Sequence, residues 1–357
     1  MKLTVRWIVS FAIAALFVWL SSRQWPLDSV VCSQAAWDDG RFRCLAGQPA
    51  TVSWVLNPLW LVAAFLVLCV VHFFRVLRWQ PLLKPLAEFD FWTLNRVGAV
   101  SFMAIFIFPL RLGEIARPYL ISKTGKMRKS AAFGTIAVER VMDGLMMALL
   151  LAVVLSFLPA GEEATYLSLR AGAFLALLVF SGALFMLVLA WFSRRLAVLL
   201  VQKVFGLVSD KLATRLAGMM DAFIDGLKAM PSRRTFLQFI GITSAYWAIN
   251  GFYYWCMVKA FGLDTLVDLP GAYAMMAAVA VGMMIPNSPA NVGSFWYFLL
   301  LPVALYGTPE GSGTPLAFAL AVWAMMLFQY VIFAGYFLMT GKVSMASIWS
   351  IQKEGLN

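Results

Sequence analysis

Long apolar stretches with few charged residues recur along this chain, separated by short polar segments. Six of them have about the length that a helix needs to cross the hydrocarbon core of a membrane, which takes about 20 residues. They cover residues 7–22, 54–74, 131–158, 166–192, 235–259 and 315–340. The pattern predicts an all-α fold: a polytopic transmembrane helix bundle with about six full spans.

Two further apolar regions do not fit simple spans. Residues 97–110 form 14 uncharged positions, about 21 Å of helix against a hydrocarbon core of roughly 30 Å. Residues 271–306 contain Pro286 and Pro289 near their middle, and two prolines so close together cannot lie inside a regular helix. Basic segments flank the first region and acidic loops flank the second. Each region therefore begins and ends on the same side of the membrane. We predict two re-entrant helical hairpins of opposite orientation, as in an inverted repeat; the alternative is pairs of thin, tilted full spans.

Composition and charge support a membrane location. The chain is 62% hydrophobic and only 13% charged, whereas a soluble domain has about 25% charged residues. The net charge is +11, and the basic residues gather in segments that alternate with acidic ones. Basic loops stay in the cytoplasm, so we expect a multi-pass protein of the bacterial inner (cytoplasmic) membrane with both termini cytoplasmic. The expected partners are anionic lipids rather than nucleic acid.

The chain divides into three parts on this reading. Residues 1–53 form an N-terminal signal-anchor helix and an exported loop, because no small-residue cleavage site follows the first apolar stretch. Residues 54–345 form a single transmembrane domain with a cytoplasmic amphipathic segment at 193–234, and residues 346–357 form a cytoplasmic tail. Cys32 and Cys44 both fall in the exported loop, where a disulfide is favoured over two free thiols.

Ionisable residues inside apolar segments are the strongest functional signal. They are Arg111, Glu114 and Arg117, then Glu139, Arg140 and Asp143. An unpaired charge at the centre of a membrane helix costs about 2.5–3.5 kcal/mol. We therefore expect ion pairs that leave Arg140 or one other arginine available for an anion such as phosphate. The alternative is a purely structural ion-pair network. Arg75 and Arg78 are interpreted as anchors at the membrane surface.

Three stretches resemble motifs of the lysylphosphatidylglycerol synthase transmembrane-region family, also called flippase-like. Residues 109–117 resemble P-x-R-x-G-E-x-x-R, residues 139–143 resemble E-R-x-x-D, and residues 286–293 resemble P-x-x-P-G-x-x-G. The resemblance covers roughly residues 54–340 and implies a bundle with re-entrant elements that moves lipids between leaflets. Known members include the flippase half of the bifunctional lysyl-phosphatidylglycerol enzyme, and others are linked to glycolipid or hopanoid pathways.

This chain departs from the family pattern at three points. No cytosolic aminoacyl-transferase domain is recognisable, so we do not expect it to synthesise the lipid. Ala290 replaces the glycine that follows the second proline of the late motif. Trp296 stands where many relatives carry a glutamate, and this puts the substrate class and proton coupling of the relatives in question for this chain.

We therefore predict a lipid flippase or transporter for an anionic lipid, either a modified phospholipid or a polyprenyl-phosphate sugar. Its expected substrate-binding residues are Arg111, Glu114, Arg117, Glu139, Arg140, Asp143, Pro286, Ser288, Pro289, Asn291 and Gly293. No catalytic residue, cofactor or metal site is predicted. Two alternatives stay open: a membrane-embedded glycosyl- or headgroup transferase that uses the exported Asp38 and Asp39, and a non-catalytic assembly partner of envelope-biosynthesis enzymes.

Overall fold

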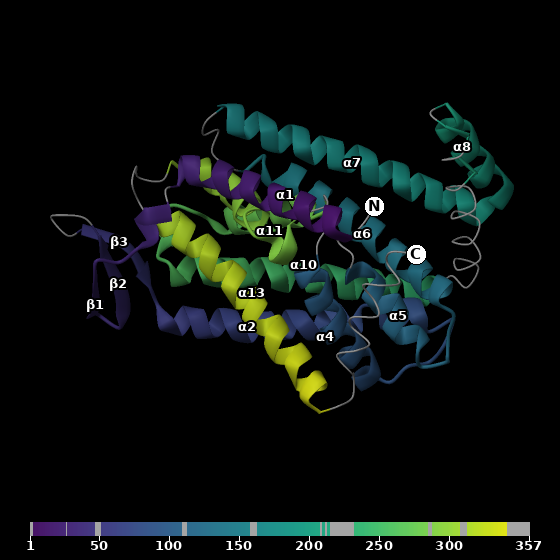
Figure 1. Ribbon diagram of the computed structural model, residues 1–357, viewed down its shortest axis with the longest axis horizontal. Coiled ribbons are helices and arrows are strands. Elements are labelled where there is room, and N and C mark those ends of the chain that lie inside the picture. Colours follow the sequence, from purple (N-terminus) through teal and green to yellow (C-terminus); the bar gives the residue numbers. More distant parts are fainter. Residues whose placement is uncertain are drawn as a thin grey trace.

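The computed structural model describes residues 3–25, 27–46, 51–108, 113–157, 163–207, 209–210, 213–214, 232–284, 288–307 and 313–340. The described chain is mostly helical, and its long helices lie side by side in one bundle (Figure 1). Each of the six predicted spans corresponds to one long helix. These helices are α1 (Leu3–Gln24), α2 (Pro58–Leu77), α6 (Lys129–Val154), α7 (Glu163–Phe192), α10 (Arg233–Ala260) and α13 (Thr314–Met339).

Several helices have the character of membrane spans. Three described helical stretches are long and apolar enough to cross a membrane: Pro58–Leu83, Ala164–Met186 and Thr314–Met339. Shorter apolar helices cover Trp7–Arg23, Phe91–Ile107 and Leu269–Gly282. Apolar side chains also cover the outer surface of α7, where Leu178 is 72% exposed. Large exposed apolar surfaces of this kind are typical of a protein that faces lipid rather than water.

The first irregular region forms a helical hairpin. After α2 the short α3 (Gln80–Leu83) leads to α4 (Phe91–Ile107), and the chain then turns back into α5 (Ala116–Ser122). The return segment lies against α4, because a side chain at Gly113 would collide with the backbone of Ala104. Glu114 lies before the start of α5 and Arg117 lies within it, so these two residues do not share one regular α-helix.

The second irregular region is also a hairpin. It consists of α11 (Leu269–Gly282), the single turn η4 (Pro289–Asn291) and α12 (Ser294–Ala304). The two helices are antiparallel, because Gly282 at the end of α11 contacts Phe298 near the start of α12, and Gly271 at the other end contacts Tyr306. Two helical hairpins are therefore present where the sequence predicted them, and their re-entrant placement in the membrane stays a prediction.

The fold also contains a small sheet, so the prediction of an all-α fold is only partly correct. Strands β1 (Gln34–Asp38), β2 (Arg41–Ala46) and β3 (Thr51–Leu56) pair antiparallel in that order. Asp39 and Gly40 both have positive φ, at 47° and 70°, as a type I′ hairpin turn requires. The predicted start of the second span at residue 54 is wrong, because residues 51–56 pair with β2 and α2 begins only after the helix cap at Asn57.

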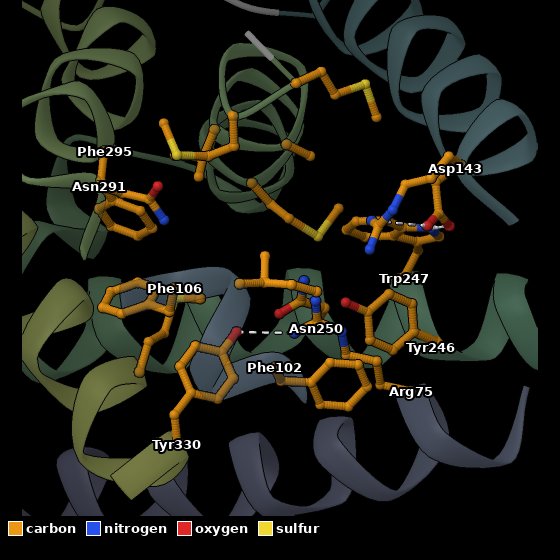
Figure 2. A pocket seen from close by; sticks show the side chains of 18 of the residues that line it. Arg75, Phe102, Phe106, Asp143, Tyr246, Trp247, Asn250, Asn291, Phe295 and Tyr330 are labelled. Atoms are coloured by element: carbon orange, nitrogen blue, oxygen red, sulfur yellow. Dashed lines mark hydrogen bonds and ion pairs between the residues drawn. The ribbon is translucent and has the colours of Figure 1, made fainter. Parts of the chain in front are cut away.

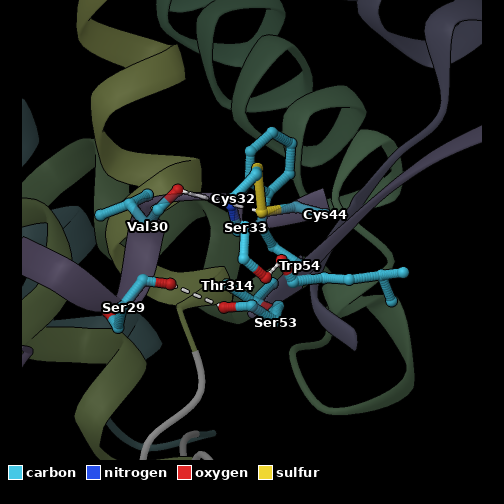
Figure 3. Close-up of a disulfide and its surroundings, with 9 residues drawn as sticks. Ser29, Val30, Cys32, Ser33, Cys44, Ser53, Trp54 and Thr314 are labelled. Carbon is cyan, nitrogen blue, oxygen red and sulfur yellow. Dashed lines mark hydrogen bonds between the residues drawn. A yellow bond between two sulfur atoms is a disulfide. The ribbon is translucent and has the colours of Figure 1, made fainter. Parts of the chain in front are cut away.

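A disulfide ties β2 to the segment between η1 (Leu27–Val30) and β1. Cys32 and Cys44 are bonded, with their Cα atoms 5.2 Å apart (Figure 3). Nearby, the Trp54 indole donates a hydrogen bond of 3.1 Å to the carbonyl of Val30. The sheet lies at one end of the bundle, while α5 and the basic α8 (Arg194–Gly206) lie at the opposite end (Figure 1). This polarity agrees with an exported disulfide and cytoplasmic basic segments.

Candidate functional site

A buried ion-pair network joins the end of α2 to α5 and α6. The Arg78 guanidinium donates to both carboxylate oxygens of Asp143, with 2.9 Å between Nη2 and Oδ2, and to Oε1 of Glu139 at 2.8 Å. Arg117 Nη1 donates to the other Glu139 oxygen at 2.8 Å. All four side chains are at most 2% exposed. Because each buried charge is both paired and hydrogen-bonded, the network holds the three helices in one arrangement.

Arg78 was missed by the interpretation of the sequence, which placed it at the membrane surface. Its side chain is only 1% exposed and forms an ion pair with Asp143, which we expected to pair with an arginine of the two motifs. The spacing of apolar residues on α2 carries a signal for this position, because the buried side chains recur at Ala64, Leu68 and Val71. Continuing that spacing by three or four residues leads to Arg75 and Arg78, on the inner face of the helix.

Looser contacts surround this network. Arg140 lies 3.7 Å from Glu114 and 3.8 Å from Asp143, and both Arg140 and Glu114 are partly exposed, at 24% and 29%. The Trp247 indole donates a hydrogen bond of 3.0 Å to Asp143 Oδ1. The structure therefore brings together five of the six charged residues predicted from the first two motifs. The sixth, Arg111, lies outside the described residues.

A cavity of about 150 Å³ adjoins the network at the centre of the bundle (Figure 2). We call it the central cavity. Its walls come from α2, α4, α6, α10, α11, η4, α12 and α13, so both hairpins contribute to it. The described lining includes seven aromatic side chains, four charged residues (Arg75, Arg78, Arg140 and Asp143) and four methionines (Met276, Met283, Met284 and Met326). The arrangement suits a ligand with an anionic group at one end.

Arg75 has no carboxylate partner in the network that the described residues form. Its Nη1 donates to the Tyr330 hydroxyl at 2.9 Å, and its guanidinium carbon lies 3.9 Å from the centre of the Phe102 ring. Within the described chain, no carboxylate lies within ion-pair distance of Arg75. Four guanidinium groups and three carboxylates make up the charged cluster as described: Arg75, Arg78, Arg117, Arg140, Glu114, Glu139 and Asp143. The cluster therefore carries an excess of positive charge beside the cavity.

The break between α11 and α12 contributes one residue of the late motif to the cavity, Asn291. Ser288 instead stabilises the loop, because its hydroxyl donates a hydrogen bond of 2.7 Å to the carbonyl of Val292. The Trp323 indole also stabilises the loop, through a hydrogen bond of 2.7 Å to the carbonyl of Ala290. Trp296, at the position of the glutamate in many relatives, packs edge-to-face on Trp323.

The remaining late-motif residues shape the backbone. Pro289 begins η4, and Gly293 has φ of 79° and packs directly against the backbone of α1 at Ala14 and Val18. A side chain at Gly293 would collide with that backbone, so glycine is required there. Pro286 lies outside the described residues.

His72 forms a second polar contact that the sequence did not predict. It is 2% exposed, and its Nε2 lies 2.9 Å from Asn95 Oδ1 while its Nδ1 lies 3.1 Å from the Gln329 amide nitrogen. These bonds use both ring nitrogens of a neutral imidazole and connect α2, α4 and α13 one turn from Arg75. His72 therefore supports the helix that carries Arg75.

The described lining of the cavity offers groups that can bind an anion. The described lining residues include no serine, cysteine or histidine, and the carboxylate of Asp143 is already occupied by Arg78 and Trp247. What the lining offers is guanidinium, amide, hydroxyl and aromatic groups. Guanidinium groups recognise phosphate oxygens through two parallel hydrogen bonds, so the site is suited to hold a phosphate-bearing group.

Comparison with known proteins identifies relatives. The sequence model of the Lysylphosphatidylglycerol synthase TM region family matches residues 7–335. Among curated proteins, the Glycosyltransferase AglD of Haloferax volcanii is 27% identical over 262 residues, which cover 66% of this chain and 42% of that relative. The chain therefore spans less than half the length of that glycosyltransferase. No solved structure matches the chain.

Proposed function

Because this chain belongs to the lysylphosphatidylglycerol synthase TM region family and is a multi-pass membrane protein, we propose that it is a lipid transporter that moves a lipid with an anionic headgroup between leaflets. The membrane we propose is the bacterial inner membrane, with both termini in the cytoplasm. The headgroup phosphate binds in the central cavity, and the acyl or prenyl chains stay in the bilayer.

The observation that carries this proposal is the unneutralised Arg75 guanidinium. A cation at membrane depth is costly unless it has a counter-charge or water, and Arg75 has no carboxylate partner among the described residues. Arg140 lies on the same cavity and makes only long ion pairs. We assign phosphate binding to Arg75 and Arg140, and we retain Arg111 in that role as a prediction from the family motif.

Arg117 was expected to bind the substrate, but in this proposal it supports the residues that do. Its Nη1 donates to Glu139, and it is not among the described residues that line the cavity. Arg78 and Arg117, with Glu139 and Asp143, form the rigid support that positions the phosphate-binding arginines. The hairpin of α11 and α12 closes the cavity from the other side, and its irregular backbone lines it at Asn291.

The test is translocation of fluorescent phosphatidylglycerol and phosphatidylcholine in proteoliposomes. We expect the wild type to move phosphatidylglycerol, and Arg75→Gln to reduce the rate at least tenfold. Arg23→Gln is a matched control, because Arg23 is an exposed arginine at the end of α1 that does not line the cavity. Full transport by a folded Arg75→Gln variant would show that the phosphate does not bind at Arg75.

A second candidate function is a membrane-embedded glycosyl- or headgroup transferase, which the name of the relative AglD favours. Its expected residues, Asp38 and Asp39, lie at the exposed turn between β1 and β2. Asp38 forms an ion pair of 2.9 Å with Arg43, and Asp39 occupies the turn itself. Loss of sugar transfer to lipid in Asp38→Asn, together with unchanged transfer in Arg75→Gln, would favour the transferase. Stable co-purification with an envelope-biosynthesis enzyme would instead support the assembly role.

A further inference from the structure

The central cavity holds several polar side chains that have no partner in the described protein. The side-chain amides of Asn250 and Asn291 and the hydroxyls of Tyr246 and Tyr254 all belong to its lining, and none makes a hydrogen bond to another described residue. Figure 2 shows Tyr246, Asn250 and Asn291 around the same space. Polar groups in protein interiors nearly always have a hydrogen-bond partner, so these four are suited to bind polar groups of a ligand.

All four groups are uncharged, and the described lining residues offer no unpaired carboxylate. Asp143 is the one carboxylate among the described lining residues, and both of its oxygens already accept hydrogen bonds from Arg78 or Trp247. An ammonium group in the cavity would therefore lack a counter-charge and would lie close to the cationic Arg75 and Arg140, which repel it.

We propose that the cavity selects lipids whose phosphate carries an uncharged, hydroxylated group, and that it rejects headgroups with an ammonium group. Arg75 and Arg140 hold the phosphate, as in the proposed function on which this inference rests. The amides of Asn250 and Asn291 and the tyrosine hydroxyls bind the hydroxyl groups of the headgroup. The rings of Tyr246 and Trp247 pack against its carbon–hydrogen faces. Glycerol-like and sugar-like groups joined through phosphate belong to this class.

Three lipids of equal net charge separate this inference from the proposed function. Phosphatidylglycerol, phosphatidylinositol and phosphatidylserine each carry a single net negative charge, but the serine headgroup contains an ammonium and the other two carry only hydroxyl groups. In proteoliposomes we expect the first two to be translocated at least tenfold faster than phosphatidylserine, a difference of about 1.4 kcal/mol. Equal rates for all three would overturn this inference and leave the proposed function standing. If none of the three is moved, both fail.

Asn250→Asp provides an internal test of the charge argument. The substitution keeps the shape of the side chain and places a carboxylate in the cavity, so the preference for phosphatidylglycerol over phosphatidylserine should fall at least fivefold. Asn57→Asp is the matched control, because Asn57 caps α2 outside the cavity and aspartate caps helices equally well. A wild-type preference in Asn57→Asp is expected. The same wild-type preference in Asn250→Asp would contradict the proposal that uncharged lining groups set the selectivity.

Discussion

Replacing Arg78 with methionine tests whether the ion-pair network supports the fold of the site. Methionine has a similar length, so the change mainly removes the charge and its hydrogen bonds. Arg78 is 1% exposed and bonds both Glu139 and Asp143. Its loss leaves two buried carboxylates that have lost a partner, and removing one member of a buried pair typically costs about 3–5 kcal/mol.

The expected loss lies at the lower end of that range. Glu139 keeps its bond to Arg117, and Asp143 keeps the Trp247 indole at 3.0 Å. We therefore expect Arg78→Met to lower the free energy of unfolding by about 3 kcal/mol. Adding Asp143→Asn removes the carboxylate that loses most, and asparagine still accepts from Trp247. The double variant should recover about 2 kcal/mol, because directly bonded residues couple by about 0.5–3 kcal/mol.

The measurement is denaturant unfolding of the protein in detergent micelles, followed by tryptophan fluorescence. Arg43→Met is the control, because the Arg43–Asp38 pair has the same chemistry on an exposed strand, with side chains 36% and 54% exposed. Exposed pairs contribute about 0–1 kcal/mol. The reasoning is refuted if Arg78→Met costs no more than Arg43→Met, or if the added Asp143→Asn lowers stability further.

Three other changes test separate parts of the fold. Ala290→Gly should stabilise the protein by up to about 1 kcal/mol in the same unfolding assay, because Ala290 has a φ of 53° that glycine adopts without strain. Asp90→Ala should cost about 1 kcal/mol of unfolding free energy near neutral pH, because it removes the cap of α4. Hydrogen bonds from the hydroxyl and the backbone N–H of Thr93 lower the pKa of Asp90 below 3.8, so the carboxylate stabilises the fold above that pH and stops doing so as the pH falls through the lowered pKa. The cost of Asp90→Ala should therefore vanish in a pH series toward acid. Replacing Cys32 and Cys44 with serine should destabilise the sheet by about 2–3 kcal/mol and speed hydrogen exchange of its amides, with lipid translocation unchanged.

One matched control and two contradicting outcomes make these three results specific. Ala277→Gly, within the regular helix α11, should destabilise by about 1 kcal/mol where Ala290→Gly stabilises, and loss of stability in both would contradict the positive-φ argument. A constant cost of Asp90→Ala from neutral to acid pH would show that the cap does not depend on the carboxylate. Unchanged amide exchange in the serine variant would show that the disulfide does not hold the sheet.

The helices of this protein were readable from its sequence for a simple physical reason. Long apolar runs with few charges require a nonpolar surrounding, and the six long helices coincide with them. The two hairpins were also recognisable, since one apolar region is too short for a span and the other contains prolines. The sheet was missed because strands β1 to β3 are short and β3 continues directly into the apolar run that predicted the second span.

The composition of the charged cluster was predicted better than its pairing. The motif residues Glu139 and Asp143 do lie together, but their main partner Arg78 comes from a helix about sixty positions earlier in the sequence. Such pairing depends on how α2 packs against α6, and hydropathy carries no information about it. Hydropathy also assigned Arg75 and Arg78 to the surface because they follow an apolar run, whereas the bundle buries that end of α2. The unpartnered amides of Asn250 and Asn291 could be identified only from the assembled cavity.

The central claim is that a lipid headgroup enters the central cavity beside Arg75. It is tested most directly with phosphatidylglycerol that carries a photoreactive diazirine on its headgroup glycerol, cross-linked in proteoliposomes and mapped by mass spectrometry. The account predicts adducts on lining residues of α10 and α11, such as Trp247 and Met276, and their loss in Arg75→Gln. Adducts confined to outward-facing residues such as Leu178 on α7, unchanged by Arg75→Gln, would contradict it.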